Sequence, residues 1–253
     1  DLLDPDEQHF IQQFDRLPQA SQALLVRMVM RKGVHFRAGK LNYGEIGCAH
    51  AAVGPLLALG WVDDECLLAF EELFALLQKG EILAAFKPWI DQPKGKKADW
   101  LEGLSAHFTD SRCFANWCPD LADTLYSLTV MDLCDRLRLM FFGNLHQDWS
   151  EFVLSDLGLY RYETVVLDQA SRAFRHNEDV RLYETLSELR DAQDEADPDL
   201  WAQRFAAVQA IETDSDWLQR RKAKTLFQLG QQAERQHWWT LAEQAYLHTS
   251  WPG

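Results

Sequence analysis

The feature that most constrains the fold is the stretch at residues 17–47, which combines helix, strand and turn signals without an acid before Glu45. Its apolar residues recur at the spacing of one helix face: Leu24, Leu25, Met28 and Val29. Ser21 is predicted to cap this helix and Gly33 to end it. Residues 34–37 then alternate as a strand does, and Gly39 permits a turn. The stretch therefore predicts a helix followed by a short strand.

The same stretch is rich in positive charge, although the chain as a whole has a net charge of -14. Its basic residues are Arg27, Arg31, Lys32, Arg37 and Lys40. Arg27 and Arg31 lie four residues apart, so a helix would project them together. Composition alone favours an ordinary solvated face. The sharper hypothesis is a surface that faces the phosphates of a nucleic acid.

Several short motifs in this stretch resemble one known family. The pairs Leu17-Pro18, Val26-Arg27 and Arg31-Lys32, followed by KLNYGEI at residues 40–46, are similar to the N-terminal part of the Fanconi-anaemia-associated nuclease family. The resemblance implies a winged-helix-like start, a SAP-type DNA-binding helix pair, a tetratricopeptide-like helical region and a C-terminal VRR-NUC nuclease domain. We expect only the first three parts within these 253 residues.

The expected fold class is therefore mainly α, with a winged-helix-like unit and a SAP helix pair followed by an α-helical tetratricopeptide-like array. We assign residues 1–62 to a winged-helix-like N-terminal domain and 63–109 to the SAP-type helices. Residues 110–167 are predicted to be a linking helical region and 168–253 an incomplete tetratricopeptide-like region. Within these domains we expect helices over 43–59 and 132–142 and a new helix opening at 63–65. The array is indicated by the spacing of Leu229, Gly230, Ala242 and Tyr246.

The sequence GKKADWL at residues 95–101 resembles the SAP pattern G-x-K-x-x-L-[IV], with Trp100 and Leu101 at its apolar positions. Lys94, Lys96 and Lys97 fall at the start of the second SAP helix. Positive charge there opposes the helix dipole unless an anion is present, and a DNA phosphate would supply one. The alternative is an ordinary lysine-rich loop.

Composition excludes several other classes of protein. No apolar run approaches the ~20 residues of a membrane span, and the scattered Cys48, Cys66, Cys113, Cys118 and Cys134 fit reduced thiols better than a disulfide framework. A pI near 4.9 excludes a surface that is basic throughout, but not a local basic track. The start at Asp1 has neither a methionine nor the pattern of a signal peptide, so we expect a fragment.

The sequence predicts no catalytic and no metal-ligating residue in this chain. A nuclease of the resembled type needs an acid followed later by E-x-K around its metal, yet no Asp or Glu has a lysine two residues on. The glycines of residues 33–40 have the wrong spacing for a phosphate loop. Mg²⁺ or Mn²⁺ is expected only for the VRR-NUC domain, as the resemblance implies.

The resemblance implies the DNA-binding and scaffold portion of a structure-specific DNA repair nuclease that acts on 5′ flaps and interstrand crosslinks. The expected partner is branched or 5′-flap DNA, with a protein partner possible on the helical array and no membrane. The expected location is the bacterial cytoplasm, or the nucleus in a eukaryote. Alternatives are a helical protein-interaction scaffold and a stand-alone DNA-binding adaptor. The expected DNA-binding residues are Arg27, Arg31, Lys32, Lys40, Tyr43, Lys94, Lys96 and Lys97.

Tyr43 matches the aromatic residue of K-L-x-Y in the family pattern. The resemblance implies that it lies on the surface near Lys40, where it would stack on an unpaired base or bond a phosphate. The alternative is a tyrosine buried beneath Leu41 and Ile46.

Overall fold

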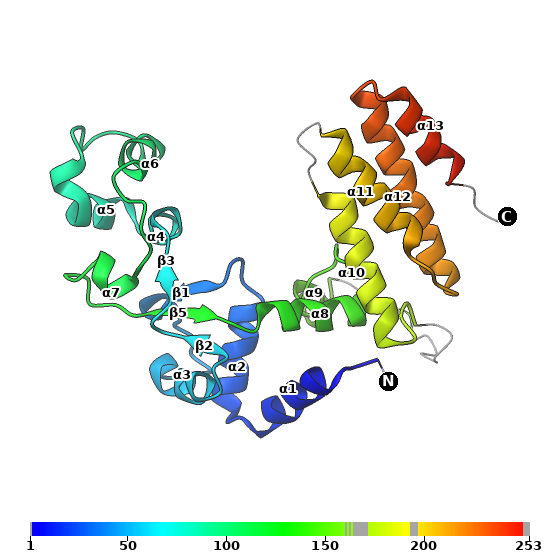
Figure 1. Ribbon diagram of the computed structural model, residues 1–253. Coiled ribbons are helices and arrows are strands. Elements are labelled where there is room, and N and C mark those ends of the chain that lie inside the picture. The colour runs from blue at the N-terminus through cyan, green and yellow to red at the C-terminus, as the bar shows by residue number, and fades with distance from the viewer. Residues whose placement is uncertain (1, 160, 162, 164–171, 193–196, 250–253) are drawn as a thin grey trace. The chain divides into compact units, whose positions relative to one another are not determined.

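The computed structural model describes residues 2–159, 161, 163, 172–192 and 197–249 (Figure 1). The chain divides into two compact units, which we call the N-terminal unit (residues 9–137 and 148–154) and the C-terminal unit (1–8, 138–147 and 155–253). The predicted fold class is confirmed, because most of the described elements are helices.

The N-terminal unit begins with a helical layer on a small sheet. Its first elements are α1 (Pro5–Arg16), α2 (Gln19–Val29), β1 (His35–Arg37), a 3₁₀ turn (Ala38–Lys40), α3 (Ala49–Ala58) and β2 (Val62–Asp63). The apolar stripe predicted for α2 is confirmed, since Leu24, Leu25 and Met28 are buried in the first core. Phe10 of α1 packs on Trp61 in the same core, with ring centroids 4.3 Å apart.

The sheet is completed by a strand from much later in the chain. β5 (Leu125–Leu128) lies in the centre, antiparallel to β1 on one side and to β2 on the other. The register places Phe36 opposite Tyr126 and Val62 opposite Leu128. The range 110–167, which the sequence assigns to a linking helical region, thus contributes the central strand of the first domain. All four residues of β5 are buried, so it lacks the alternation that marks a strand.

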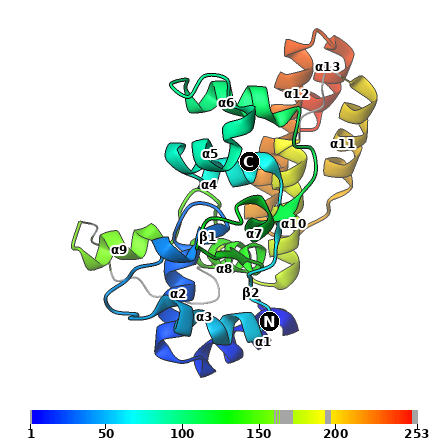
Figure 2. The same cartoon turned by 90° about the vertical axis from the view of Figure 1, so that its left-hand side faces the viewer.

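A second helical group follows β2 and has its own core. It comprises β3 (Leu67–Leu68), α4 (Phe70–Leu76), α5 (Lys79–Phe86), a 3₁₀ turn (Lys87–Trp89), α6 (Lys97–Ser105), β4 (Arg112–Cys113) and α7 (Phe114–Trp117). The helix pair predicted within residues 63–109 corresponds to α5 and α6, and α6 begins at Lys97, where the second helix of the pair was expected. Figures 1 and 2 both show α4–α6 at one end of the N-terminal unit, with the sheet between them and α2–α3.

Two predicted helix starts are wrong. The helix expected from residue 43 begins only at Ala49, because residues 44–47 form a turn in which Gly47 has a φ of +73°. The helix expected at 63–65 is absent, and α4 begins at Phe70. Asp63 instead accepts a hydrogen bond from the backbone N–H of Glu65 at 2.8 Å, which favours a turn over a helix.

The predicted cap at Ser21 is also wrong. Helix α2 starts two residues earlier, at Gln19, directly after Pro18. Proline has a φ fixed near the helical range, so it is suited to a helix start. Ser21 lies buried within the first turn of α2.

The C-terminal unit consists mainly of helices. It contains α10 (Asn177–Asp191), α11 (Pro198–Ala210), α12 (Asp216–Arg235) and α13 (Trp239–Leu247), while α1, α8 (Met131–Phe142) and α9 (Ser150–Asp156) carry residues of both units. The helix expected over 132–142 is confirmed as α8. The boundary expected at 167/168 lies outside the described residues. None of the helices in the described part of the chain has the length and apolar character of a membrane span.

Helices α12 and α13 pack through the residues that suggested a tetratricopeptide-like unit. A Cβ at Gly230 would lie 2.6 Å from the ring of Tyr246, so only glycine permits this approach. Leu229, Ala242 and Ala245 are buried in the same core. Arg221 of α12 stacks on Tyr183 of α10, with its guanidinium carbon 3.7 Å from the ring centroid. Arg221 therefore takes part in the packing of α12 on α10.

Candidate nucleic-acid interface

The first basic surface, which we define as Arg27, Arg31, Lys32, Lys40 and Tyr43, lies on α2 and the two loops beside it. Arg31 Nη1 donates a hydrogen bond to the Tyr43 hydroxyl at 3.2 Å. The guanidinium carbon of Arg27 lies 5.4 Å from the centroid of the Tyr43 ring. The spacing of four residues therefore does bring the two arginines together, with Tyr43 between them. Lys32 follows α2 and Lys40 ends the 3₁₀ turn, and both side chains are exposed.

One charge on this surface is offset by an acid that sequence reasoning did not single out. Arg27 donates to Glu45 Oε1 from Nε at 3.0 Å and from Nη2 at 2.5 Å. The pKa of Glu45 is lowered, first by a hydrogen bond from its own backbone amide and next by Arg27. Both side chains are about half exposed, so the pair is open to water and to salt. A phosphate approaching Arg27 would compete with Glu45.

The burial of Tyr43 is intermediate between the exposed and the buried alternatives expected for it. Its side chain is half-buried and packs on the edge of the first core, while Leu41 and Ile46 are fully inside that core. Its hydroxyl faces Arg31, and its ring faces Arg27. Tyr43 therefore orients both arginines and keeps part of its own surface accessible.

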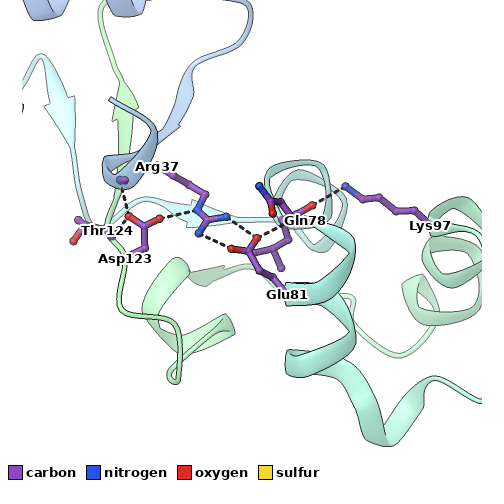
Figure 3. Close-up of polar contacts among 8 residues, drawn as sticks. Arg37, Gln78, Glu81, Lys97, Asp123 and Thr124 are labelled. Atoms are coloured by element: carbon purple, nitrogen blue, oxygen red, sulfur yellow. Dashed lines mark hydrogen bonds and ion pairs between the residues drawn. The ribbon is translucent and has the colours of Figure 1, made fainter. Parts of the chain in front are cut away.

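Arg37 does not belong to the exposed positive charge, although the sequence groups it there. It is only 7% exposed and forms ion pairs with two carboxylates. Its Nη1 and Nη2 donate to the Glu81 carboxylate at 2.7 and 2.8 Å, and its Nε donates to Asp123 Oδ2 at 2.8 Å (Figure 3). The pKa of Arg37 is raised, chiefly by the hydrogen bonds to Glu81. Arg37 is therefore a structural cation.

The Arg37 network also fixes the turn that carries Lys40. Asp123 accepts hydrogen bonds from the backbone N–H groups of Gly39 at 3.0 Å and Thr124 at 2.9 Å. A Cβ at Gly39 would lie 3.3 Å from Asp123 Oδ2, so the carboxylate sits directly on the turn. The segment before β5 thereby holds the end of β1 in place.

The second basic surface, which we define as Lys94, Lys96 and Lys97, lies at the N-terminus of α6. Lys96 precedes the first helical residue, and its backbone N–H donates to Asp99 Oδ2 at 3.3 Å. The turn before it is fixed by Trp100, whose Nε1 donates to the carbonyl of Gln92 at 2.9 Å. The loop that presents these lysines therefore has a defined conformation.

The three lysines differ in their surroundings. Lys94 and Lys96 are exposed, whereas Lys97 is half-buried. The ammonium of Lys97 donates to the carbonyl of Leu77 at 2.9 Å (Figure 3). It also lies 5.4 Å from the centroid of the Phe74 ring. Lys97 thus contributes to packing, and Lys94 and Lys96 are better placed to meet a ligand.

The residues that the structure describes do not fit a catalytic metal. Within the described ranges, no three His, Cys, Asp or Glu side chains are grouped so that they could hold a metal ion. Glu45, Glu81 and Asp123 accept hydrogen bonds from arginines, and Asp99 accepts one from the backbone N–H of Lys96. The arrangement offers two basic surfaces of the kind that attracts polyanions.

Two family models match successive parts of the chain. The model described as "FAN1, HTH domain" matches residues 1–63, and that described as "Fanconi anemia-associated nuclease SAP domain" matches residues 67–117. The first basic surface lies in the first matched range and the second in the other.

Similar proteins extend the match along the chain. The sequence is 48% identical over all 253 residues to the Fanconi-associated nuclease 1 homolog of Pseudomonas aeruginosa, and 27% identical over 208 residues to the homolog of Arabidopsis thaliana. The chain spans 45% of the first protein and 23% of the second, and the second match covers 77% of this chain.

Solved structures of a similar protein also match the whole length of this chain. Crystal structures of paFAN1 bound to 5′-flap DNA with a gap, carrying flaps of 2 and 1 nucleotides, superpose with TM-scores of 0.88 and 0.83. Both are 48% identical in sequence, and the match covers 100% of this chain and 46% of theirs.

Proposed function

This chain belongs to the Fanconi-anaemia-associated nuclease family, and on that premise we propose that it is the DNA-binding and scaffold portion of a structure-specific DNA repair nuclease. The partner we propose is branched DNA with a 5′ flap. The observation that carries the proposal is the 48% identity and TM-score of 0.88 to a protein solved with 5′-flap DNA.

The two basic surfaces support this proposal physically. Arg31, Lys32 and Lys40 would neutralise phosphates beside α2, and Lys94 and Lys96 would do so at the start of α6. Each neutralised phosphate releases bound counterions, so affinity depends on salt but not on sequence. The N-terminus of α6 adds the partial positive charge of its free N–H groups. Such contacts position a duplex and leave recognition of the branch to other groups.

Tyr43 is our candidate for recognition of the branch on the first surface. Stacking of an aromatic side chain on an unpaired base contributes ~1–3 kcal/mol. Because Tyr43 is half-buried and held by Arg31, it would offer an edge or part of its face. Its hydroxyl would also keep Arg31 directed at a neighbouring phosphate.

We propose that cleavage comes from a VRR-NUC domain outside these 253 residues. The chain spans less than half of the Pseudomonas relative, and its described residues offer no metal site. The metal proposed for that domain is Mg²⁺ or Mn²⁺. We propose an intracellular location because the proposed partner is DNA, in the cytoplasm of a bacterium or the nucleus of a eukaryote.

A protein partner on the helical array is a second candidate function. Trp239 and Leu247 of α13 are exposed, and they border a hollow of about 380 Å³ between α12 and α13. Glu234 and Glu243 also line it. Its apolar surface and acidic rim favour an amphipathic helix with basic residues along its edges.

Fluorescence anisotropy with a labelled 5′-flap duplex and the same duplex without a flap would test the proposed function. We expect binding of both DNAs, tighter for the flap and weaker as salt rises. With Mn²⁺ present, we expect no cleavage by the chain alone. Absence of DNA binding at low salt would contradict the proposal, and cleavage that copurifies with the chain would contradict the placement of the active site.

A further inference from the structure

We propose that Trp89 is a stacking platform for an unpaired base of branched DNA. This inference rests on the proposed function and adds a contact for the single-stranded part of the substrate. Trp89 lies in the 3₁₀ turn between α5 and α6, and it is 50% exposed. By contrast, Trp100 and Trp117 of the same helical group are buried in its core.

The backbone around Trp89 is fixed on both sides. Pro88 precedes it inside the 3₁₀ turn, where proline restricts the backbone. Ile90 follows it and is buried, which anchors the chain in the second core. The tryptophan is therefore held at the surface between two constrained residues.

The ring of Trp89 also packs against another aromatic ring, that of Phe108. It meets Phe108 edge to face, with centroids 5.4 Å apart and planes at 73°. Phe108 in turn stacks on the buried Phe70, with centroids 5.0 Å apart, and contacts Phe86 and Trp117 at 5.3 and 5.7 Å. Trp89 is thus the outermost ring of a packed aromatic cluster. A ring that is already ordered loses little conformational freedom when a ligand stacks on it.

The charge of the surrounding segment favours a nucleic acid over a protein or an apolar ligand. Residues 79–97 contain five lysines and two acids, a net charge of +3 in a chain of net charge -14. One of the two acids, Glu81, is already paired with Arg37. Lys87 is exposed in the same turn as Trp89, and Lys94 and Lys96 are exposed in the loop that follows. An aromatic face among lysines is the arrangement used to bind single strands.

The occupant we infer is an unpaired base rather than a base pair. Bases inside a duplex are stacked on one another, so their faces are not available to a side chain. A flap or gap exposes such a face, and the neighbouring lysines would hold the adjoining phosphates. Trp89 would therefore contribute to the preference for branched DNA and little to the affinity for plain duplex.

The test compares Trp89→Ala and Trp89→Phe with the wild-type chain, using anisotropy on a 5′-flap DNA and on its flapless duplex. The control is Trp239→Ala, because Trp239 is 60% exposed but lies on α13 of the C-terminal unit. We expect Trp89→Ala to weaken flap binding by roughly 5- to 150-fold, the range that stacking of one base implies. Duplex binding should change less than about twofold, Trp89→Phe should be intermediate, and Trp239→Ala should match wild type.

Flap affinity of Trp89→Ala within twofold of wild type would overturn the proposal, as would equal losses on both DNAs. A wild-type chain that binds neither DNA would instead refute the proposed function itself. If the alanine variant melts early, Trp89→Leu keeps an apolar contact with Phe108 but has no aromatic face. Flap-selective weakening in the leucine variant supports stacking, and its absence overturns it.

Discussion

Arg37 of β1 and Glu81 of α5 form a two-pronged ion pair, with Nη1 2.7 Å from Oε2 and Nη2 2.8 Å from Oε1. The two residues lie in the ranges matched by the HTH and SAP models, respectively. Asp123, on the segment that leads into β5, supplies the third contact. A single buried guanidinium therefore ties three distant parts of the sequence into the N-terminal unit.

Loss of this cation should destabilise the N-terminal unit strongly. Arg37→Ala leaves the carboxylates of Glu81 and Asp123 close together without a counter-charge, and we expect a loss of about 3 kcal/mol. Thermal or denaturant unfolding of the whole chain measures it. Arg27→Ala is the matched control, because it breaks an exposed ion pair and should leave the unfolding midpoint nearly unchanged. Equal stability of the two variants would contradict the structural role of Arg37.

The same ion pair predicts a loss of stability in acid. The pKa of Glu81 is lowered, first by the hydrogen bonds from Arg37. A carboxyl with a depressed folded pKa contributes stability that is present above its unfolded pKa, about 4.3, and is lost as pH falls through the folded value. The free energy of unfolding should therefore decline below about pH 4.3, and the decline should be shallower in Glu81→Gln. Denaturant titrations between pH 7 and pH 3 would show it; parallel profiles would exclude Glu81 as a contributor.

Substitutions at Tyr43 should separate its hydroxyl from its ring. Tyr43→Phe removes the acceptor of Arg31 but keeps the ring beside Arg27, so we expect a normal melting temperature and flap binding weakened by less than about tenfold. Tyr43→Ala removes both contacts and should weaken flap binding further. Anisotropy and melting curves of both variants measure this. If the alanine variant melts early and binds flap and duplex equally, Tyr43 serves only the core.

Replacement by alanine should have opposite effects on stability at two helical glycines, Gly230 of α12 and Gly103 of α6. A Cβ at Gly230 would meet the Tyr246 ring at 2.6 Å, so Gly230→Ala should destabilise the C-terminal unit by about 1–3 kcal/mol. A Cβ at Gly103 of α6 would have no neighbour within 4 Å. Gly103→Ala should therefore be neutral or stabilising by up to about 1 kcal/mol, since alanine favours helix. Similar melting temperatures for both variants would rule out the close approach.

Local pattern predicts the helices of this chain well. The apolar stripe of α2, the pair α5 and α6, and α8 all follow from the spacing of their apolar residues. The residues at which helices start are harder to predict. In the alanine- and leucine-rich segment that forms α3, the turn at Gly47 delays the start of the helix to Ala49. β5 could not be found by periodicity, since its buried side chains all read as apolar or small.

Some features of the candidate site could likewise be predicted from the sequence, and others could not. The four-residue spacing of Arg27 and Arg31 predicts their proximity, and both meet Tyr43. The burial of Arg37 could not be predicted, because its partners Glu81 and Asp123 are 44 and 86 residues away in sequence. Trp89 carries no motif, and its exposure follows only from the way the second core closes beneath it.

The salt dependence of DNA binding tests the central claim most directly. For wild type on a 5′-flap DNA, the plot of log affinity against log salt should be linear and negative, with about -0.9 for each phosphate neutralised. Lys94→Ala/Lys96→Ala removes the two exposed lysines at the start of α6 and should flatten the slope by roughly two units. An unchanged slope in this variant, or a wild-type chain that does not bind the flap at low salt, would contradict the account.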